Sequence, residues 1–469
     1  MFLRDIREKG VDAVRQSNDT LALGNGALVE AARGFLWDCR GGRPVLLDLG
    51  HVESSHINFE LLVKEGESWG VDHELTDMFR FGFSYKADLE LQVVGCPHLI
   101  SLRENYVRMV KDTRAMASDE KTSRFFEVSD HIQFVPCRFG SKGSAKKDGY
   151  YLDGTAKRRP TNEGGAPRKP TNDTDGIPVR PINVATEETT SHPEESAYLK
   201  WAHENKPRMS DAMKAIAVLK HLAWLLAMDW EVYMFGDDCA CFFNQFRTRA
   251  SQWPFTTFLM DDEQFNAQFV LEKGMTFGPS KASQLAQRIA NFIIEMFCQR
   301  MDKADEPFVK KEAESNPALK AWLLERGTQE GGKWKWSTQC RLYAAFMYTD
   351  DPFFVCLGAD RLVRMLVVWE GLTQELGLIM NKDKRGVGTH LVWLGFNILA
   401  TPGMLCITKK KVVKLTLQIA AAIDGTLLLS DYRSMMGSLE HILFATNRDR
   451  AQMLGLWRPL RGEWEPNNY

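Results

Sequence analysis

Apolar positions recur at helical spacing in several separate blocks of the chain. Between residues 196 and 230 they fall at intervals of three and four, which predicts a helix with one buried face made of Met213, Ile216, Leu219, Leu222, Ala223 and Ala227. The same spacing predicts helices over 101–117 and 282–301. Another helix is predicted over 362–376, ending at Gly377, a residue type that commonly follows a helix C terminus.

Short apolar runs between these blocks predict strands. The run 231–235 ends in Gly236-Asp237-Asp238. Two further runs, 342–347 and 353–357, flank Tyr348-Thr349-Asp350-Asp351, which is typical of a β-hairpin with two carboxylates at its tip. Other short strands are predicted at 45–49, 391–399 and 404–408, and the chain after residue 412 is predicted to be mostly helical.

Residues 137–185 differ from the rest in composition. They are rich in Gly, Pro, Thr, Asn, Lys and Arg and poor in large apolar residues, which favours an exposed loop or linker. Basic residues gather within this segment and outnumber the acidic ones: Arg138, Lys142, Lys146, Lys147, Lys157, Arg158, Arg159, Arg168 and Lys169. The run could bind phosphate groups, serve as a solvated linker, hold a template backbone, or act as a nuclear import signal at residues 157–160.

The overall charge alters the interpretation only slightly. The chain has 469 residues, a formal net charge of −2 and a pI of about 6.6, so any nucleic-acid contact has to come from a local basic patch. The cysteines are dispersed, which predicts reduced thiols. The first residues lack an apolar signal core and no apolar stretch reaches membrane-spanning length, so we expect an intracellular protein, nuclear or cytoplasmic, that is neither secreted nor membrane-bound.

Two predicted strand ends carry paired carboxylates, at Asp237-Asp238 and at Asp350-Asp351. Magnesium prefers oxygen ligands, and two such ions held by carboxylates from different strands can catalyse attack on a nucleoside triphosphate. The alternative is that each pair caps a turn, and this alternative is favoured for Asp261-Asp262. The order of the surrounding motifs favours the metal site for the other two pairs.

Residues 135–445 resemble the reverse transcriptase family. The string 348–351 looks like its catalytic hairpin, and 237–246 is similar to its first palm strand, where one metal-binding Asp precedes an aromatic pair. Residues 277–288 resemble its Phe-Gly turn and following helix, with Ser283 where the family usually has Pro. Three later strings continue the family order: 375–384, 393–396, and 430–439, the last resembling thumb helices of retrotransposon enzymes allied to tyrosine-recombinase elements.

The resemblance implies an α+β fold of the right-hand polymerase type, with fingers, a palm built on a small antiparallel sheet plus helices, and a helical thumb. It divides the chain into an N-terminal region of unknown role, fingers with the basic loop, a palm with a fingers insertion at 250–280, and palm end with thumb. These regions are expected at 1–130, 131–230, 231–400 and 401–469.

The resemblance also implies roles for single residues. Asp350, Asp351 and one of Asp237 and Asp238 would hold metal; Asp238 is preferred because Phe243 and Gln245 then follow at the family's spacing. The expected nucleotide-binding residues are Lys157, Arg158, Arg159, Phe243, Phe242, Gly278, Gln287, Tyr348 and Lys384, with Phe243 or Phe242 excluding the ribose 2′-hydroxyl. The expected primer grip is Trp393, Leu394 and Gly395.

The sequence therefore predicts an RNA-directed DNA polymerase that extends a primer on an RNA or DNA template from deoxynucleoside triphosphates. Two Mg²⁺ ions, with Mn²⁺ as a substitute, are the expected cofactors. The alternatives are a catalytically inactive, reverse-transcriptase-like protein that binds nucleic acid, and an RNA-dependent RNA polymerase. The sequence does not specify an oligomeric state.

Overall fold

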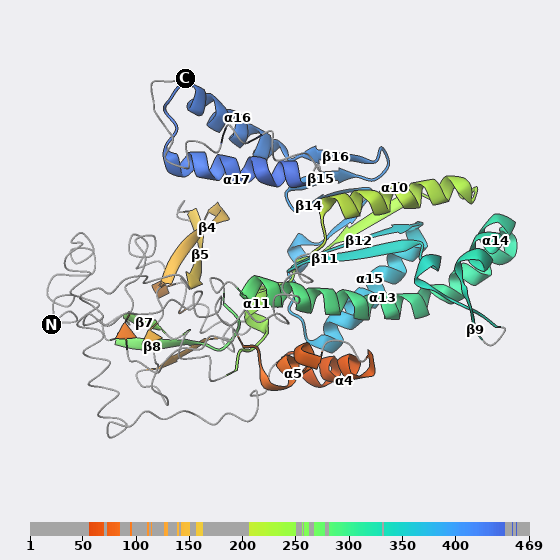
Figure 1. Ribbon diagram of the computed structural model, residues 1–469, viewed down its shortest axis with the longest axis horizontal. Helices are drawn as coiled ribbons and strands as arrows, with labels where there is room; N and C mark the ends of the chain where they lie inside the picture. Colours follow the sequence, from red (N-terminus) through yellow and green to blue (C-terminus); the bar gives the residue numbers. More distant parts are fainter. Residues whose placement is uncertain are drawn as a thin grey trace. The chain divides into compact units, whose positions relative to one another are not determined.

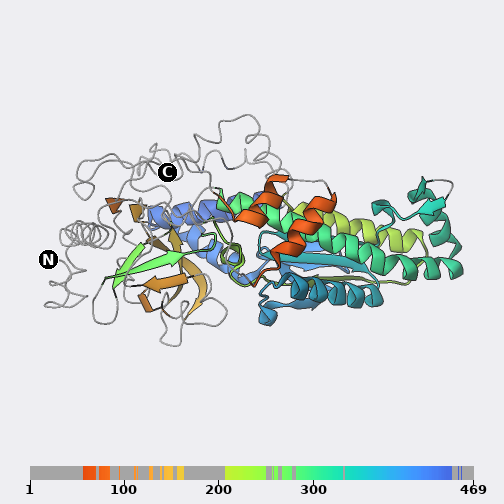
Figure 2. The same cartoon turned by 90° about the horizontal axis from the view of Figure 1, so that it is seen from below.

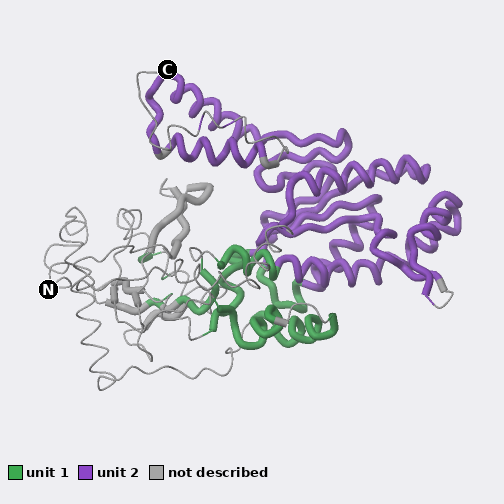
Figure 3. The backbone as a smooth tube through the Cα atoms, viewed as in Figure 1, with its two compact units in different colours: residues 1–204, 240–289, 373–379 green, residues 205–239, 290–372, 380–469 purple. Residues whose placement is uncertain are grey.

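The computed structural model describes residues 56–69, 73–84, 94–95, 110–111, 114, 126–129, 138–139, 142–150, 156–162, 206–249, 256, 258–261, 267–276, 281–330, 333–445, 453 and 456. The chain forms two compact units that interleave along the sequence (Figure 3). Unit 1 comprises 1–204, 240–289 and 373–379, and unit 2 comprises 205–239, 290–372 and 380–469.

The centre of unit 2 is an antiparallel four-stranded sheet in the order β11-β12-β6-β13 (Figure 1). Its strands are β6 (Val232–Gly236), β11 (Tyr343–Tyr348), β12 (Asp351–Leu357) and β13 (Gly386–Gly388). Strand β12 lies inside the sheet and is almost wholly buried, which suits its continuous apolar sequence. The predicted strands at 231–235, 342–347 and 353–357 are confirmed.

Helices cover both faces of this sheet, as Figures 1 and 2 show. Alternate residues of β12 point to opposite faces, so Phe353 and Val355 join the core cluster of α10 (Met209–Leu225). On the other face Phe354 lies 4.7 Å from Phe297 of α13 (Ala282–Ser315) and 5.0 Å from Trp369 of α15 (Ala359–Leu376), measured between ring centroids. The predicted helix at 282–301 is confirmed and extends to residue 315.

A second antiparallel sheet of unit 2 has the order β14-β15-β16, with bounds His390–Trp393, Phe396–Leu399 and Met404–Ile407. A turn therefore splits the single strand predicted at 391–399. Two helices follow, α16 (Lys409–Ile423) and α17 (Leu429–Ala445), and they share a small cluster around Leu415, Tyr432 and Met436. Unit 2 also contains α14 (Pro317–Arg326), β9 (Thr328–Glu330), β10 (Lys333–Lys335), η4 (Thr338–Cys340) and η5 (Lys382–Lys384).

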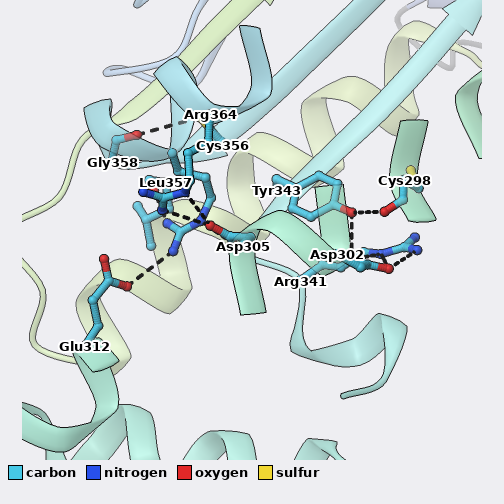
Figure 4. A network of polar contacts seen from close by, with 11 residues as sticks. Cys298, Asp302, Asp305, Glu312, Arg341, Tyr343, Cys356, Leu357, Gly358 and Arg364 are labelled. Carbon is cyan, nitrogen blue, oxygen red and sulfur yellow. Dashed lines mark hydrogen bonds and ion pairs between the residues drawn. The ribbon is translucent and has the colours of Figure 1, made fainter. Parts of the chain in front are cut away.

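A buried ion-pair network joins α13 to α15 (Figure 4). Asp305, fully buried on α13, accepts from Arg361 at 2.7 Å and from Arg364 at 2.8 Å, both on α15. Arg361 also donates to the Leu357 carbonyl at the end of β12 and to Glu312 at 3.3 Å. One turn earlier on α13, Asp302 accepts from Arg341 at 2.6 Å and from the Tyr343 hydroxyl at 2.7 Å. The far end of the hairpin is thus clamped to the helices behind the sheet.

Unit 1 contains helices α4 (Phe59–Trp69), α5 (His73–Phe81) and α11 (Phe242–Gln245). Its short strands are β1 (Val94–Gly95), β2 (Phe126–Ser129), β3 (Arg138–Phe139), β4 (Lys142–Tyr150), β5 (Ala156–Asn162), β7 (Phe258–Asp261) and β8 (Ala267–Glu272). The three strands β2, β8 and β7 form one antiparallel sheet. Part of the core of unit 1 consists of edge-to-face ring contacts in the series Phe79, Phe83, Phe246 and Phe242.

Strands β4 and β5 correct the expectation of a loop or linker between residues 142 and 162, because they pair as an antiparallel hairpin; residues 163–185 lie outside the described residues. Cross-strand pairing and the twist of a ribbon can outweigh a composition poor in apolar residues. The predicted helix at 101–117 is described only at residues 110–111 and 114, and the strand predicted at 45–49 lies outside the described residues. Among the described helices, none combines the length and the apolar character that crossing a membrane requires.

Together these elements form a mixed helix-and-sheet fold with small antiparallel sheets. The four-part division of the chain into N-terminal region, fingers, palm and thumb stays a prediction, which the two compact units do not test.

Candidate active site

The two acidic pairs meet at one end of the four-stranded sheet. Strands β6 and β12 run antiparallel with Gly236 opposite Phe353, so the end of β6 lies beside the start of β12. Two backbone hydrogen bonds continue the pairing: Asp237 donates to the Pro352 carbonyl at 3.2 Å and Cys239 donates to the Asp350 carbonyl at 2.9 Å. The structure therefore brings together two strand ends that lie about 110 residues apart in the sequence.

The β11–β12 connection is a tight hairpin in which Tyr348 pairs with Asp351, leaving Thr349 and Asp350 as the turn. Tight two-residue hairpin turns require positive φ at their first position, and Thr349 adopts φ 57°. A non-glycine residue in this conformation costs about 1–3 kcal/mol and persists only where the surroundings determine it. Such a turn holds the Asp350 and Asp351 backbones in fixed positions, as a binding site requires.

Asp237 is buried within a set of donors. Its Oδ2 atom accepts from Trp369 Nε1 at 3.1 Å, Arg385 Nε at 3.2 Å and Arg385 Nη2 at 2.8 Å. Its Oδ1 atom accepts from the Asp238 backbone N–H at 3.0 Å. The side chain has no exposed surface.

Asp238 differs from its neighbour. Its carboxylate is partly exposed, and both of its oxygens lie 2.9 Å from Lys384 Nζ. Lys384 is on η5, and the Asn381 backbone N–H donates to the Asp238 carbonyl at 2.8 Å, which brings this segment alongside. The predicted Asp238 and Lys384 thus lie together, joined by an ion pair.

The charge of this site is reflected in two pKa values. Burial raises the pKa of Asp351 to about 7, with further increases from the carboxylates of Asp350 and Asp238 and an opposing effect of Lys384. Burial also raises the pKa of Cys239 well above its usual value, and four carboxylates add to this: Asp350, Asp237, Asp238 and Asp351. The carboxylates therefore lie within electrostatic reach of one another and carry more negative charge than the nearby cations offset.

The donor set suits a hard divalent cation, because it consists of carboxylate oxygens. Across the described part of the chain, however, no three His, Cys, Asp or Glu side chains are grouped closely enough to hold a metal ion. In this arrangement the Lys384 ammonium lies where a cation would contact Asp238. Side-chain rotation at Asp238 and Lys384 would be required for the carboxylates to share an ion.

The predicted primer-grip residues form the turn between β14 and β15. Trp393 donates through Nε1 to the Asp351 carbonyl at 3.1 Å and stacks on Phe353 at 4.8 Å between centroids, so the turn is attached to the β11–β12 hairpin. Leu394 and Gly395 adopt φ 48° and 76°, the pair of positive values that tight hairpin turns use. The Leu394 carbonyl oxygen lies 3.0 Å from Nε2 of His441 on α17.

The remaining predicted residues are more scattered. Tyr348 lies on β11 with Lys206 Nζ 4.0 Å from its ring centroid. Phe242 and Phe243 are both buried in unit 1, and exclusion of the ribose 2′-hydroxyl by either ring stays a prediction. Gln287, on α13, is also buried in unit 1. Gly278 lies outside the described residues. Lys157, Arg158 and Arg159 occupy β5, where the backbone of Arg158 pairs with Lys146; their proposed phosphate contacts stay predictions.

Arg385 and Trp369 contact the site although the sequence did not single them out. Arg385 directly follows Lys384, so a second basic residue in that segment was a visible signal. Trp369 was predicted only as part of a helix, and nothing local distinguishes it from a core tryptophan. Only the packing of α15 against the sheet shows that its indole N–H faces Asp237.

No protein-family model and no curated protein matches the chain. Among solved structures it is similar to a foamy viral protease–reverse transcriptase in complex with double-stranded DNA, at 11% identity and TM-score 0.36, covering 81% of this chain and 56% of that one. It is also similar to a foamy viral protease–reverse transcriptase in complex with an RNA/DNA hybrid, at 12% identity and TM-score 0.41, covering 99% and 43%. A telomerase from Candida albicans in complex with a fragment of telomeric RNA matches at 11% identity and TM-score 0.38, covering 76% and 61%.

The chain spans between 43% and 61% of the length of these three structures. At such identities and TM-scores the similarity establishes neither family nor activity. The function has to be argued from the residues of the chain itself.

Proposed function

We propose that the chain is an RNA-directed DNA polymerase of retrotransposon type, related to the enzymes of tyrosine-recombinase elements and working in the nucleus or cytoplasm. One observation carries the proposal: Asp238 and the Asp350–Asp351 hairpin lie at neighbouring strand ends, and crowding by carboxylates contributes to the raised pKa of Asp351. Burial is the main cause of that raised pKa and the like charges add to it, and a group of carboxylates that repel one another is suited to bind cations.

In this proposal Asp238, Asp350 and Asp351 would hold two Mg²⁺ ions, or Mn²⁺ in their place, once the Lys384 ammonium has left Asp238. When bound, the ions would lower the pKa of the primer 3′-hydroxyl and offset charge on the triphosphate. The residues of the chain position the reactants: the hairpin turn fixes two carboxylates, and the turn 393–395 lies against it to hold the primer end. Lys384 leaves Asp238 and contacts the phosphates of the incoming nucleotide, as an ammonium point charge can.

The larger layout is proposed on the same basis. The four-stranded sheet with α10, α13 and α15 would be the palm, and α16 with α17 the thumb. The basic hairpin β4–β5 would serve as part of the fingers and bind the phosphates of nucleotide or template through Lys157, Arg158 and Arg159. Template with primer, and deoxynucleoside triphosphates, are then the partners.

Primer extension tests the proposal. Purified chain is given a labelled primer on RNA or DNA template, with deoxynucleotides or ribonucleotides, in Mg²⁺ or Mn²⁺. We expect metal-dependent extension with deoxynucleotides on RNA template, lost in Asp238→Asn and retained in Asp424→Asn, an exposed control after α16. Extension only with ribonucleotides would identify an RNA polymerase instead. Binding of the duplex without extension under any condition would favour an inactive nucleic-acid-binding protein.

The sugar gate is tested in the same assay. Replacing Phe243 or Phe242 by Val would relax discrimination against ribonucleotides if that ring contacts the sugar. Because both rings are buried, thermal stability has to be measured in parallel. Unchanged discrimination in both folded variants would place the gate elsewhere.

A further inference from the structure

We propose that Asp237 is a positioning residue: with Arg385 and Trp369 it forms a buried lock that fixes the backbone from which the Asp238 carboxylate reaches the metal. This inference rests on the proposed function, since it assigns Asp238 as the ligand. In this proposal Asp238 binds the metal ion, and Asp237 holds the backbone of Asp238 in position.

The hydrogen bonding and burial of Asp237 favour a positioning role over a ligand role in this arrangement. A carboxylate offers about four acceptor positions. Asp237 receives four donors, one from Trp369, two from Arg385 and one from the Asp238 backbone, all within 2.8–3.2 Å. Three of these donors share Oδ2, so a metal ion at that oxygen would have to displace the arginine or the indole and leave a charge or donor unpaired. Oδ1 accepts only the Asp238 backbone N–H, but the whole side chain has no exposed surface.

The lock acts directly on the backbone of Asp238. The Asp238 N–H donates to Asp237 Oδ1, while the Asp238 carbonyl accepts from Asn381 at 2.8 Å. The next residue, Cys239, donates to the Asp350 carbonyl at 2.9 Å. The peptide units on both sides of the Asp238 Cα are therefore held, one of them by Asp237, and this restricts the direction in which the Asp238 side chain leaves the backbone.

The lock also positions the segment that carries Lys384. Arg385 follows Lys384 directly, and Gly386 pairs with Gly236 in the sheet. With the Arg385 guanidinium held on Asp237, the neighbouring ammonium is held near Asp238. Lys384 can leave Asp238 by rotating its flexible side chain while the backbone stays in place.

Trp369 is a rigid component of this lock. Its ring is fully buried, 5.0 Å from Phe354 and 6.0 Å from Phe297 between centroids. Core packing on two sides fixes the direction of the indole N–H. Trp369→Phe keeps an aromatic ring in the core but removes the N–H donor together with part of the indole, so it loosens the lock at one hydrogen bond and also costs some packing.

The competing view is that Asp237 and Arg385 form an ion pair that stabilises the fold and has no effect on the metal. The two views differ in what a mild variant changes. Loss of an outer partner that orients a metal ligand typically weakens metal affinity about 10–100-fold. A purely stabilising ion pair would lower the melting temperature and leave metal affinity unchanged.

The experiment measures Mn²⁺ affinity by electron paramagnetic resonance, the Mg²⁺ concentration for half-maximal primer extension, and the melting temperature. The variants are Trp369→Phe, Arg385→Lys and Asp237→Asn, with Asp238→Asn as reference and Trp224→Phe, an exposed tryptophan on α10, as matched control. We expect Trp369→Phe and Arg385→Lys to weaken Mn²⁺ binding and raise the Mg²⁺ requirement about tenfold, while kcat at saturating Mg²⁺ stays within threefold of the unmodified chain. Trp224→Phe should change none of these.

Two outcomes would contradict the proposal that Asp237 is a positioning residue. Folded Trp369→Phe and Arg385→Lys variants with unchanged Mn²⁺ affinity, beside an Asp238→Asn variant that has lost it, would reduce Asp237 to a stabilising residue. Loss of Mn²⁺ binding in Asp237→Asn as complete as in Asp238→Asn, with Trp369→Phe unaffected, would make Asp237 a ligand. If Asp237→Asn does not fold, the paired Asp237→Asn/Arg385→Gln variant removes both charges, and it should show the same weakened affinity.

The proposed function fails in a different way. Full Mn²⁺ affinity and extension in Asp238→Asn would remove Asp238 from the site, whatever the lock variants do.

Discussion

Two groups of carboxylates in unit 2, one around Asp305 and one around Asp351, are built from the same residue type and differ in their partners. Asp305 has no exposed surface and is paired with two arginines, Arg361 and Arg364. Asp351 is half-buried; its partial burial raises its pKa to about 7, the carboxylates of Asp350 and Asp238 add to the rise, and a single lysine, Lys384, opposes it. A carboxylate with matched guanidinium partners holds helices together, whereas one crowded by like charges binds a proton or, as we propose, a metal ion.

The largest effect is expected from substitutions in the group of carboxylates around Asp351. Asp350→Asn and Asp351→Asn should each lower single-turnover primer extension by about a thousandfold, equivalent to about 4 kcal/mol of transition-state stabilisation. Because the substitution also removes like-charge repulsion, the urea midpoint should stay the same or rise. Extension within tenfold of the unmodified chain, in a folded variant, would remove that residue from the catalytic group.

Removing an arginine from the Asp305 network should instead lower the stability of the fold. Arg361→Met leaves Asp305 with one arginine and Glu312 without its buried partner, so we expect unit 2 to lose about 3–5 kcal/mol of unfolding free energy. Urea denaturation followed by circular dichroism measures this loss.

Arg80→Met is the matched control for that variant, because Arg80 pairs with Glu67 at the surface. Exposed ion pairs contribute about 0–1 kcal/mol. Equal losses in the two variants would contradict the contrast between buried and exposed pairs.

The raised pKa of Asp351 predicts a pH dependence. A carboxyl group whose pKa is higher in the folded state stabilises the fold when protonated, and this contribution is lost as pH rises through about 7. Mn²⁺ binds the ionised form and offsets the repulsion, so it should raise the melting temperature more at pH 8 than at pH 5.5.

Differential scanning fluorimetry with and without Mn²⁺ at the two pH values measures this difference. Asp351→Asn should remove most of it. An equal shift at both pH values in the unmodified chain would show that Asp351 does not titrate with the metal.

The smallest expected effect concerns the lysine of the crowded group. Lys384→Met removes the ammonium that pairs with Asp238, so Mn²⁺ affinity should rise about threefold to tenfold. If the same ammonium contacts nucleotide phosphates during the reaction, the KM for deoxynucleotide should rise as well. Lys382→Met, at an exposed lysine two residues earlier, is the control. Weaker metal binding in Lys384→Met would contradict its role as a competing cation.

The sequence by itself determined the local elements of the site. Alternating and continuous apolar runs predicted the strands around 348–351 and the strand before Asp237, and Gly377 correctly marked the end of α15, where it adopts φ 71°. These features depend on residues that are neighbours in the sequence, so periodicity and turn chemistry are sufficient to predict them. Where composition alone was used, for 137–185, the expected loop proved to contain a hairpin.

Only the tertiary structure decided what each carboxylate faces. Spacing slightly favoured Asp238 over Asp237, but the difference between them arises from Trp369 and Arg385, which lie 132 and 148 residues away in the sequence. The Asp305 network likewise joins residues 56 and 59 positions apart. Whether a buried charge is paired or crowded depends on which distant side chains pack around it, and a local sequence pattern carries no information about those partners.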